Sequence, residues 1–121
     1  MEAKEILKVA ANALNDKKAI NLSALKVDDL TVITEYFLLA SATSSTHVRA
    51  LADEVEFKLS QAGAAVHHIE GKSTGWILLD YGSVIIHVFS REAREFYNLD
   101  KMWNDAQAVA LDEILTSEQE N

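Results

Sequence analysis

The chain has 121 residues, no cysteine, and 11 basic against 19 acidic side chains, which give a formal net charge of −8. Without cysteine it cannot form disulfides, use a thiol nucleophile or hold a cysteine-ligated metal. The acidic balance argues against a protein whose main contact is a nucleic-acid backbone, because that contact needs clustered Lys and Arg, and it suits a basic protein partner or simple solubility.

A helix and two strands are predicted at the start of the chain. Apolar residues recur at helical spacing over residues 3–17, which indicates an amphipathic helix. Glu2 and Glu5 lie in its first turn and no long apolar run follows, so we expect neither a signal peptide nor a membrane span, and a soluble cytoplasmic protein. Residues 19–25 alternate between apolar and polar and predict a half-exposed strand, whereas residues 34–42 predict a better-buried one.

A second helix is predicted after the hydroxyl-rich run at residues 43–46. Serine and threonine side chains cap free amides at helix starts, and Gly63 is a suitable residue to end the helix. The apolar face of this helix consists of Val48, Leu51, Ala52, Val55 and Leu59. We expect this face to cover the sheet.

Three strands with short links follow, and they form the centre of the predicted fold. Residues 66–70, 76–79 and 84–89 are rich in β-branched and aromatic residues, and Gly82 marks a tight turn before the last strand. The short links predict an antiparallel meander. The last two strands are almost continuously apolar, so we expect both of their faces to be covered and the pair to lie near the middle of the sheet.

The chain ends in predicted helices. Ser90 is placed to cap a helix over residues 91–97, and residues 99–103 predict a further turn or short helix. Residues 105–121 are acidic, have weak helical spacing and predict a loosely packed extension to a single domain over residues 1–104. The element order predicts an α/β fold with a mixed sheet and helices packed on it.

Polar and amphipathic residues are set into or beside the apolar hairpin. They are Glu70, Lys72, Trp76, Asp80, Tyr81 and His87. Trp76 has two interpretations: it fills one face of the sheet, or it is an exposed aromatic anchor beside Tyr81 and the acidic residues, which would suit a basic partner. Arg94 is placed to pair with Glu70 or Asp80 and would then be a positioning residue.

Metal-binding and nucleophilic interpretations fit the sequence less well. Adjacent His67 and His68 would point to opposite faces of a strand and cannot both bind one metal ion. His87 lies between two apolar residues and suits a hydrogen-bonded core position. The serines that precede the predicted helices lack the Gly-x-Ser-x-Gly setting of a nucleophile and suit helix capping. We therefore predict no metal site and no cofactor.

Several motifs resemble one known family. Residues 70–89 contain an EG pair followed by W, and then DYG and HVF. Residues 91–103 read REAREFYNLDKMW, and residues 34–53 read TEYFLLASATSSTHVRALAD. These motifs resemble those of the bacterial ribosomal silencing factor family, whose plant relative is called Iojap. The resemblance covers residues 5–104.

The resemblance implies a fold without an active site. The family fold is a five-stranded mixed sheet with nucleotidyltransferase-like topology, and the phosphate-binding turn of such transferases would correspond to residues 40–46. Ala42 stands where their glycine is expected, Glu35 stands where the family commonly has aspartate, and no Asp-x-Asp pair follows. We expect no enzyme activity, and a nucleotide-binding enzyme is the less favoured alternative.

The resemblance also implies a function. It implies a translational repressor that binds the large ribosomal subunit through ribosomal protein L-fourteen and sterically blocks joining of the small subunit. The contacts expected on this chain are Trp76, Tyr81, Glu70, Asp80, Lys72 and Arg94. A large-subunit assembly factor that uses the same surface is the alternative. A homodimer is also expected, with the strand at residues 19–25 or the C-terminal extension as its edge.

Overall fold

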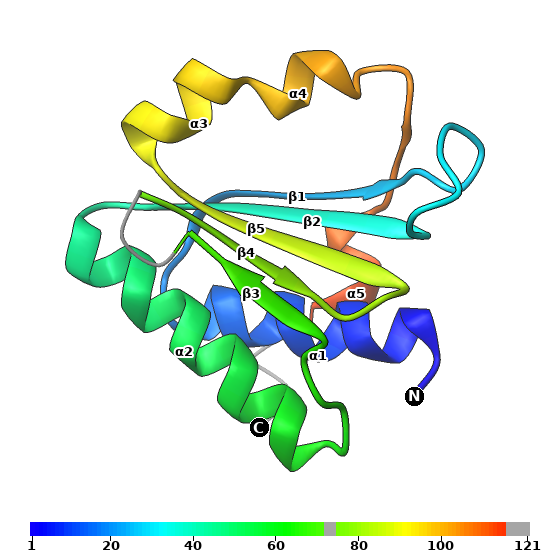
Figure 1. Cartoon of the computed structure of the whole chain (residues 1–121), viewed down its shortest axis with the longest axis horizontal. Coiled ribbons are helices and arrows are strands. Elements are labelled where there is room, and N and C mark those ends of the chain that lie inside the picture. The colour runs from blue at the N-terminus through cyan, green and yellow to red at the C-terminus, as the bar shows by residue number, and fades with distance from the viewer. Residues whose placement is uncertain (72–74, 116–121) are drawn as a thin grey trace.

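The computed structural model describes residues 1–71 and 75–115, which form one mixed sheet with helices on both faces (Figure 1). The elements in chain order are α1 (Ala3–Asp16), β1 (Ile20–Lys26), β2 (Tyr36–Ala42), α2 (Ser45–Gln61), β3 (His68–Glu70), β4 (Trp76–Asp80), β5 (Val84–Ser90), α3 (Arg91–Tyr97), α4 (Leu99–Met102), β6 (Gln107–Ala108) and α5 (Leu111–Ile114). Helices α1 and α2 cover one face of the sheet, and α3 and α4 lie over the other.

The strand order in the sheet is β3-β4-β5-β2-β1-β6. Strands β2 and β5 pair in parallel at the centre, and every other neighbouring pair is antiparallel. The predicted α/β fold with a mixed sheet is confirmed, as is the antiparallel β3-β4-β5 meander. The two-residue strand β6 makes the sheet six-stranded rather than five-stranded.

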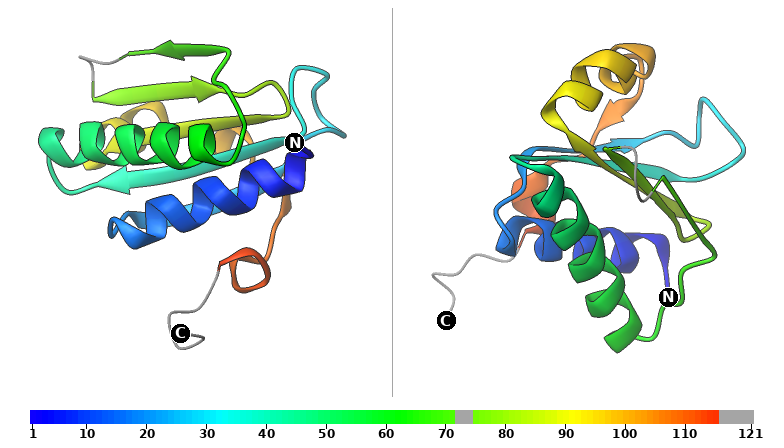
Figure 2. Two further views of the ribbon diagram at one scale, coloured as in Figure 1. Left: turned by 90° about the horizontal axis from the view of Figure 1, so that it is seen from below. Right: turned by 60° about the vertical axis from the view of Figure 1, so that its left-hand side comes forward.

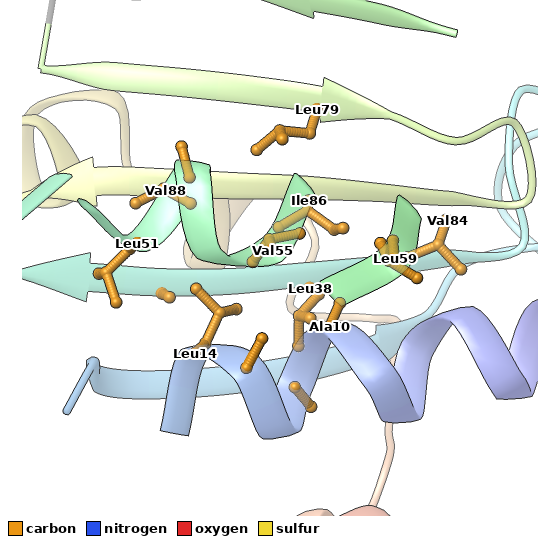
Figure 3. Packing of buried hydrophobic residues seen from close by; sticks show 14 of the residues in the cluster. Ala10, Leu14, Leu38, Leu51, Val55, Leu59, Leu79, Val84, Ile86 and Val88 are labelled. Atoms are coloured by element: carbon orange, nitrogen blue, oxygen red, sulfur yellow. The ribbon is translucent and has the colours of Figure 1, made fainter. Parts of the chain in front are cut away.

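The main core lies between the sheet and helices α1 and α2, which run side by side (Figure 2). Alternate residues of the central strands, such as Leu38 and Ile86, point toward apolar side chains of the two helices, such as Leu14 and Val55 (Figure 3). The predicted apolar face of α2 is buried along its whole length. Burial of the apolar side chains of the main core is the largest stabilising contribution to the fold.

Side chains define the helix ends as predicted. The Ser44 hydroxyl accepts a hydrogen bond from the backbone N–H of His47 at 3.1 Å, and the Ser90 hydroxyl accepts one from Ala93 at 3.1 Å. Gly63, with φ of +100°, follows the C-cap of α2 in a conformation that glycine adopts without strain. Among the described residues, no helix has both the length and the apolar character needed to cross a membrane.

A smaller core packs under α3 and α4 on the opposite face. It consists of Val27, Phe37, Leu39, Phe89 and Ala93, with Leu25, Trp76, Ile85, Leu99, Trp103 and Ala106 partly buried around it. Phe37 is central to this cluster, because its ring meets that of Trp103 edge to face at a centroid distance of 4.9 Å.

Arg94 ties α3 to the strands below it. Its guanidinium donates to both carboxylate oxygens of Asp100, at 2.8 and 2.9 Å, to the Asn21 carbonyl at 2.9 Å and to the Ser41 hydroxyl at 3.1 Å. Asn21 has φ of +51° at an irregularity in β1. The guanidinium also holds the pKa of Asp100 below its usual value.

The expected pairing of Arg94 with Glu70 or Asp80 is therefore wrong. Helix α3 packs on β5 and β2, so Arg94 reaches the β1 and β2 side of the sheet rather than the β3 and β4 side. Its role is structural: it joins α3 and α4 to the sheet.

The C-terminal segment differs from the weak helix predicted over residues 105–121. Its described part forms β6, which pairs with β1, and the single-turn helix α5, which contacts α1. Ile114 packs against the main core, and its carbonyl accepts a hydrogen bond from the Asn12 side chain at 2.9 Å. The described part of this segment thus forms two short elements, β6 and α5, that pack on the domain. Residues 116–121 lie outside the described residues.

We predict that Arg94→Ala lowers the free energy of unfolding by at least about 2 kcal/mol, because it removes hydrogen bonds to a charged group, to the buried Ser41 hydroxyl and to the Asn21 carbonyl. Urea unfolding followed by circular dichroism measures this difference. Arg91→Ala is the matched control, since Arg91 is an exposed arginine on the same helix. Equal unfolding midpoints for the two variants would contradict the structural role of Arg94.

Candidate protein-binding surface

The candidate site lies on the face of β4 that α3 and α4 leave partly open. Successive side chains of a strand point to opposite faces, so Ile77 and Leu79 are buried toward α1 and α2. Trp76, Leu78 and Asp80 point to the other face and are only half-buried. An inner strand of the sheet therefore presents part of its side chains to solvent.

Strand register and helix packing bring two further residues to this face. Glu70 of β3 pairs with Leu78, so both side chains lie on the same side of the sheet. Tyr97, at the end of α3, has its ring centroid 4.5 Å from that of Trp76. We call Glu70, Trp76, Leu78, Asp80 and Tyr97 the β4 surface.

Trp76 is both a packing residue and an exposed one. Its ring stacks on Phe89 with a centroid distance of 5.2 Å, and its indole N–H donates to Nδ1 of His87 at 3.2 Å. The residue is nevertheless only half-buried. Trp76 therefore fits both interpretations in part. It packs against the small core on one face of the sheet, and it is also partly exposed.

His87 fixes the orientation of this indole ring. It is 4% exposed, and because its Nδ1 accepts the Trp76 hydrogen bond, the ring proton lies on Nε2. Among the described residues Nε2 has no hydrogen-bond partner, and the ring meets Phe37 edge to face at 5.0 Å. Burial, with a smaller effect of the Arg94 charge, lowers the pKa of His87 to about 4. The predicted hydrogen-bonded core histidine is confirmed, and we assign it as a positioning residue.

Two carboxylates lie on the same face of the sheet as the aromatic residues. Asp80 accepts a hydrogen bond from the backbone N–H of Gly82 at 2.7 Å, which shapes the turn between β4 and β5. Glu70 is exposed, and its Oε2 lies 2.6 Å from Nε2 of His68. An exposed contact of this kind contributes little to stability, so Glu70 can exchange His68 for a cation of another protein without loss of fold.

The expected position of Tyr81 beside Trp76 is wrong. Tyr81 is 4% exposed and belongs to the main core, on the α1 and α2 side of the sheet. Burial raises the pKa of its hydroxyl to about 12, and that hydroxyl has no hydrogen-bond partner among the described residues. Side chains an odd number of positions apart on a strand point to opposite faces, as those of positions 76 and 81 do. Side chains two positions apart point to the same face, which places Leu78 beside Trp76 on the β4 surface.

The two remaining expected contacts are Lys72 and Arg94. Lys72 lies outside the described residues. The Arg94 side chain is bound to Asp100 and to the strands below α3. Tyr97 is not among the expected contacts, because its approach to Trp76 depends on how α3 packs.

Residues 40–46, which would correspond to the phosphate-binding turn of a transferase, have a structural role. Ala42 is fully buried at the end of β2, and Ser44 caps α2. In the described part of the chain, no three histidine or acidic side chains are grouped closely enough to hold a metal ion. The β4 surface offers aromatic, aliphatic and carboxylate groups to a partner.

Known proteins resemble this chain over nearly its whole length. A protein-family model described as "Ribosomal silencing factor during starvation" matches residues 1–121, so the match extends beyond residues 5–104. The "Ribosomal silencing factor RsfS" of Bacillus subtilis is 38% identical over 113 residues, which are 93% of this chain and 96% of that protein. The protein of the same name from Halalkalibacterium halodurans is 35% identical over 117 residues, 96% of this chain and 100% of that protein.

A solved structure has the same fold. The crystal structure of a Chromobacterium violaceum protein aligns with a TM-score of 0.83 and 34% sequence identity, and the alignment covers 86% of this chain and 88% of that one. Sequence and structure therefore lead to the same family.

We predict that His87 makes stability depend on pH. The pKa of His87 is about 4 when folded and about 6.5 when unfolded, so its neutral form contributes stability that is complete above pH 6.5 and is lost as the pH falls toward 4. The loss is at most about 3 kcal/mol. Urea unfolding at pH 7 and pH 4.5 measures it, with His87→Gln as a non-titrating comparison that retains an acceptor. An identical pH dependence in both proteins would contradict the prediction.

Proposed function

The chain belongs to the ribosomal silencing factor family and has a ribosome-silencing role, and we propose that it represses translation by binding ribosomal protein L-fourteen on the large ribosomal subunit. Bound there, it sterically prevents the small subunit from joining. The observation that carries this proposal is the β4 surface, in which a tryptophan in contact with a tyrosine shares one face of the sheet with an aliphatic residue and two carboxylates.

The composition of the β4 surface favours a basic protein as its partner. Aromatic residues are enriched at the energetic centres of interfaces because they bury a large area with few rotatable bonds. Glu70 and Asp80 complement Lys and Arg side chains, and a net charge of −8 accelerates encounter with a cationic surface. The same charge disfavours bare RNA.

The hydrogen bond from Trp76 to His87 supports an anchoring role. A side chain that is ordered before binding loses little conformational entropy when the complex forms. Trp76 is held by this bond and by stacking on Phe89. The surface is therefore pre-organised for binding.

Steric repression requires affinity and bulk but no catalytic step. We propose that the protein is not an enzyme and that it acts in the cytoplasm, where its ribosomal target is found. An assembly factor would use the same surface, and subunit-joining kinetics with purified components separate the two roles. A homodimer stays a prediction. Strand β1 is bordered by β6 at Leu25 and Lys26, so the open edge expected at residues 19–25 is partly closed.

We predict that Trp76→Ala weakens binding to purified large ribosomal subunits by more than about tenfold, because a hot-spot aromatic residue contributes about 2 kcal/mol or more. Sucrose-gradient co-sedimentation over a range of protein concentrations measures the affinity. Full co-migration of the variant with large subunits would exclude Trp76 as the anchor.

Tyr81→Phe is the matched control for Trp76→Ala, because Tyr81 is a second aromatic residue of the same hairpin. Because the Tyr81 hydroxyl is buried and has no partner among the described residues, its removal is expected to leave binding unchanged and to leave stability equal or higher by up to about 1 kcal/mol. Weaker ribosome binding by this variant would return Tyr81 to the contact set.

A further inference from the structure

The loop between β1 and β2 presents three aliphatic side chains to solvent. Leu30, Val32 and Ile33 are 48%, 104% and 68% exposed. Within the described residues, every exposed leucine, valine and isoleucine lies in this loop. The loop extends beyond the end of the sheet (the cyan segment in Figure 1).

The loop has a defined shape. Val27 is fully buried, its carbonyl accepts from Leu30 and Thr31, and its N–H donates to the Glu35 carbonyl at 2.8 Å. At the far end, Glu35 and Tyr36 both donate to the Ser83 carbonyl. The base of the loop is therefore closed by hydrogen bonds, and the exposed aliphatic side chains are held away from the core.

Carboxylates flank the aliphatic residues in the loop sequence. Asp28, Asp29 and Glu35 lie in the loop, and the only nearby lysine in the adjoining strand, Lys26, is paired with Asp28 at 2.7 Å. Glu35 also lines a shallow hollow that contains Met1 and the acidic residues Glu2 and Glu5. The end of the molecule thus combines apolar side chains with negative charge.

This combination matches lysine and arginine side chains. Their alkyl stems cover apolar surface while their charged ends meet carboxylates. An RNA backbone or an anionic lipid would be repelled by the same acids, and a second copy of this chain would bring an equally acidic loop. A basic protein segment is the occupant that satisfies both halves of the surface.

We propose that the β1–β2 loop is a second docking element, and that it receives a lysine- or arginine-rich protein segment of the large ribosomal subunit. This proposal rests on the proposed function. The loop is joined by hydrogen bonds to Ser83, in the turn that follows Asp80, so it lies at the same end of the sheet as part of the β4 surface. Two sites on one rigid body strengthen binding, because the second contact forms at high effective concentration.

The first test compares affinities for purified large subunits. We expect the double variant Val32→Ser and Ile33→Ser to bind about tenfold more weakly than the unaltered protein, and Asp29→Lys to bind more weakly as well. Phe57→Ser is the control, because Phe57 is a 55% exposed apolar residue on α2, away from both surfaces. All of these residues are exposed, so we expect the variants to fold. Unchanged thermal unfolding midpoints verify this.

The second test identifies the occupant. A photo-crosslinking benzoylphenylalanine is placed at position 32 or, as control, at position 57, and the protein is irradiated on purified large subunits. We expect crosslinking from position 32 to a Lys- or Arg-rich segment of a ribosomal protein. Crosslinking to ribosomal RNA, to a second copy of the chain, or to nothing overturns the proposal.

The outcomes separate this inference from the proposed function. If the unaltered protein does not bind large subunits, both fail. If it binds and Trp76→Ala weakens binding while the loop variants match Phe57→Ser, only the docking role of the loop fails.

Discussion

The alternation of side chains along β4 is the constraint on which the rest of the structure depends. A strand in the interior of a sheet is usually covered on both faces, but here the helices of one layer leave part of one face open. Ile77 and Leu79 supply the core, while Trp76, Leu78 and Asp80, one position out of step, supply the surface. A shift of register by one residue would exchange the residues of the core and those of the β4 surface completely.

Trp76 and His87 connect the small core with the β4 surface. The histidine is kept neutral by burial, and only the neutral ring can accept the indole hydrogen bond at Nδ1 while it carries its proton on Nε2. Through this bond a buried histidine orients a tryptophan that packs on the small core and is also partly exposed.

Much of the fold could be predicted from the sequence because its signals are local. Helical spacing, serine caps and the glycine turn each act over a few residues, and the elements they predict are present, apart from the helix predicted over residues 105–121. The site was less predictable. The partner of Arg94 depends on how α3 crosses the sheet, and the approach of Tyr97 to Trp76 depends on the same crossing. Tyr81 lies away from Trp76 although the two residues are close in sequence, because strand alternation sends their side chains to opposite faces of the sheet.

The two outermost strands of the described sheet are short, with three residues in β3 and two in β6. Long apolar strands such as β2 and β5 would promote amyloid-like growth if their backbone groups were unpaired, but both are enclosed in the middle of the sheet. The short border strands themselves offer few N–H and C=O groups to an incoming chain, although β6 borders β1 only at Leu25 and Lys26. The two long apolar strands thus lie where neither can act as an edge for self-association.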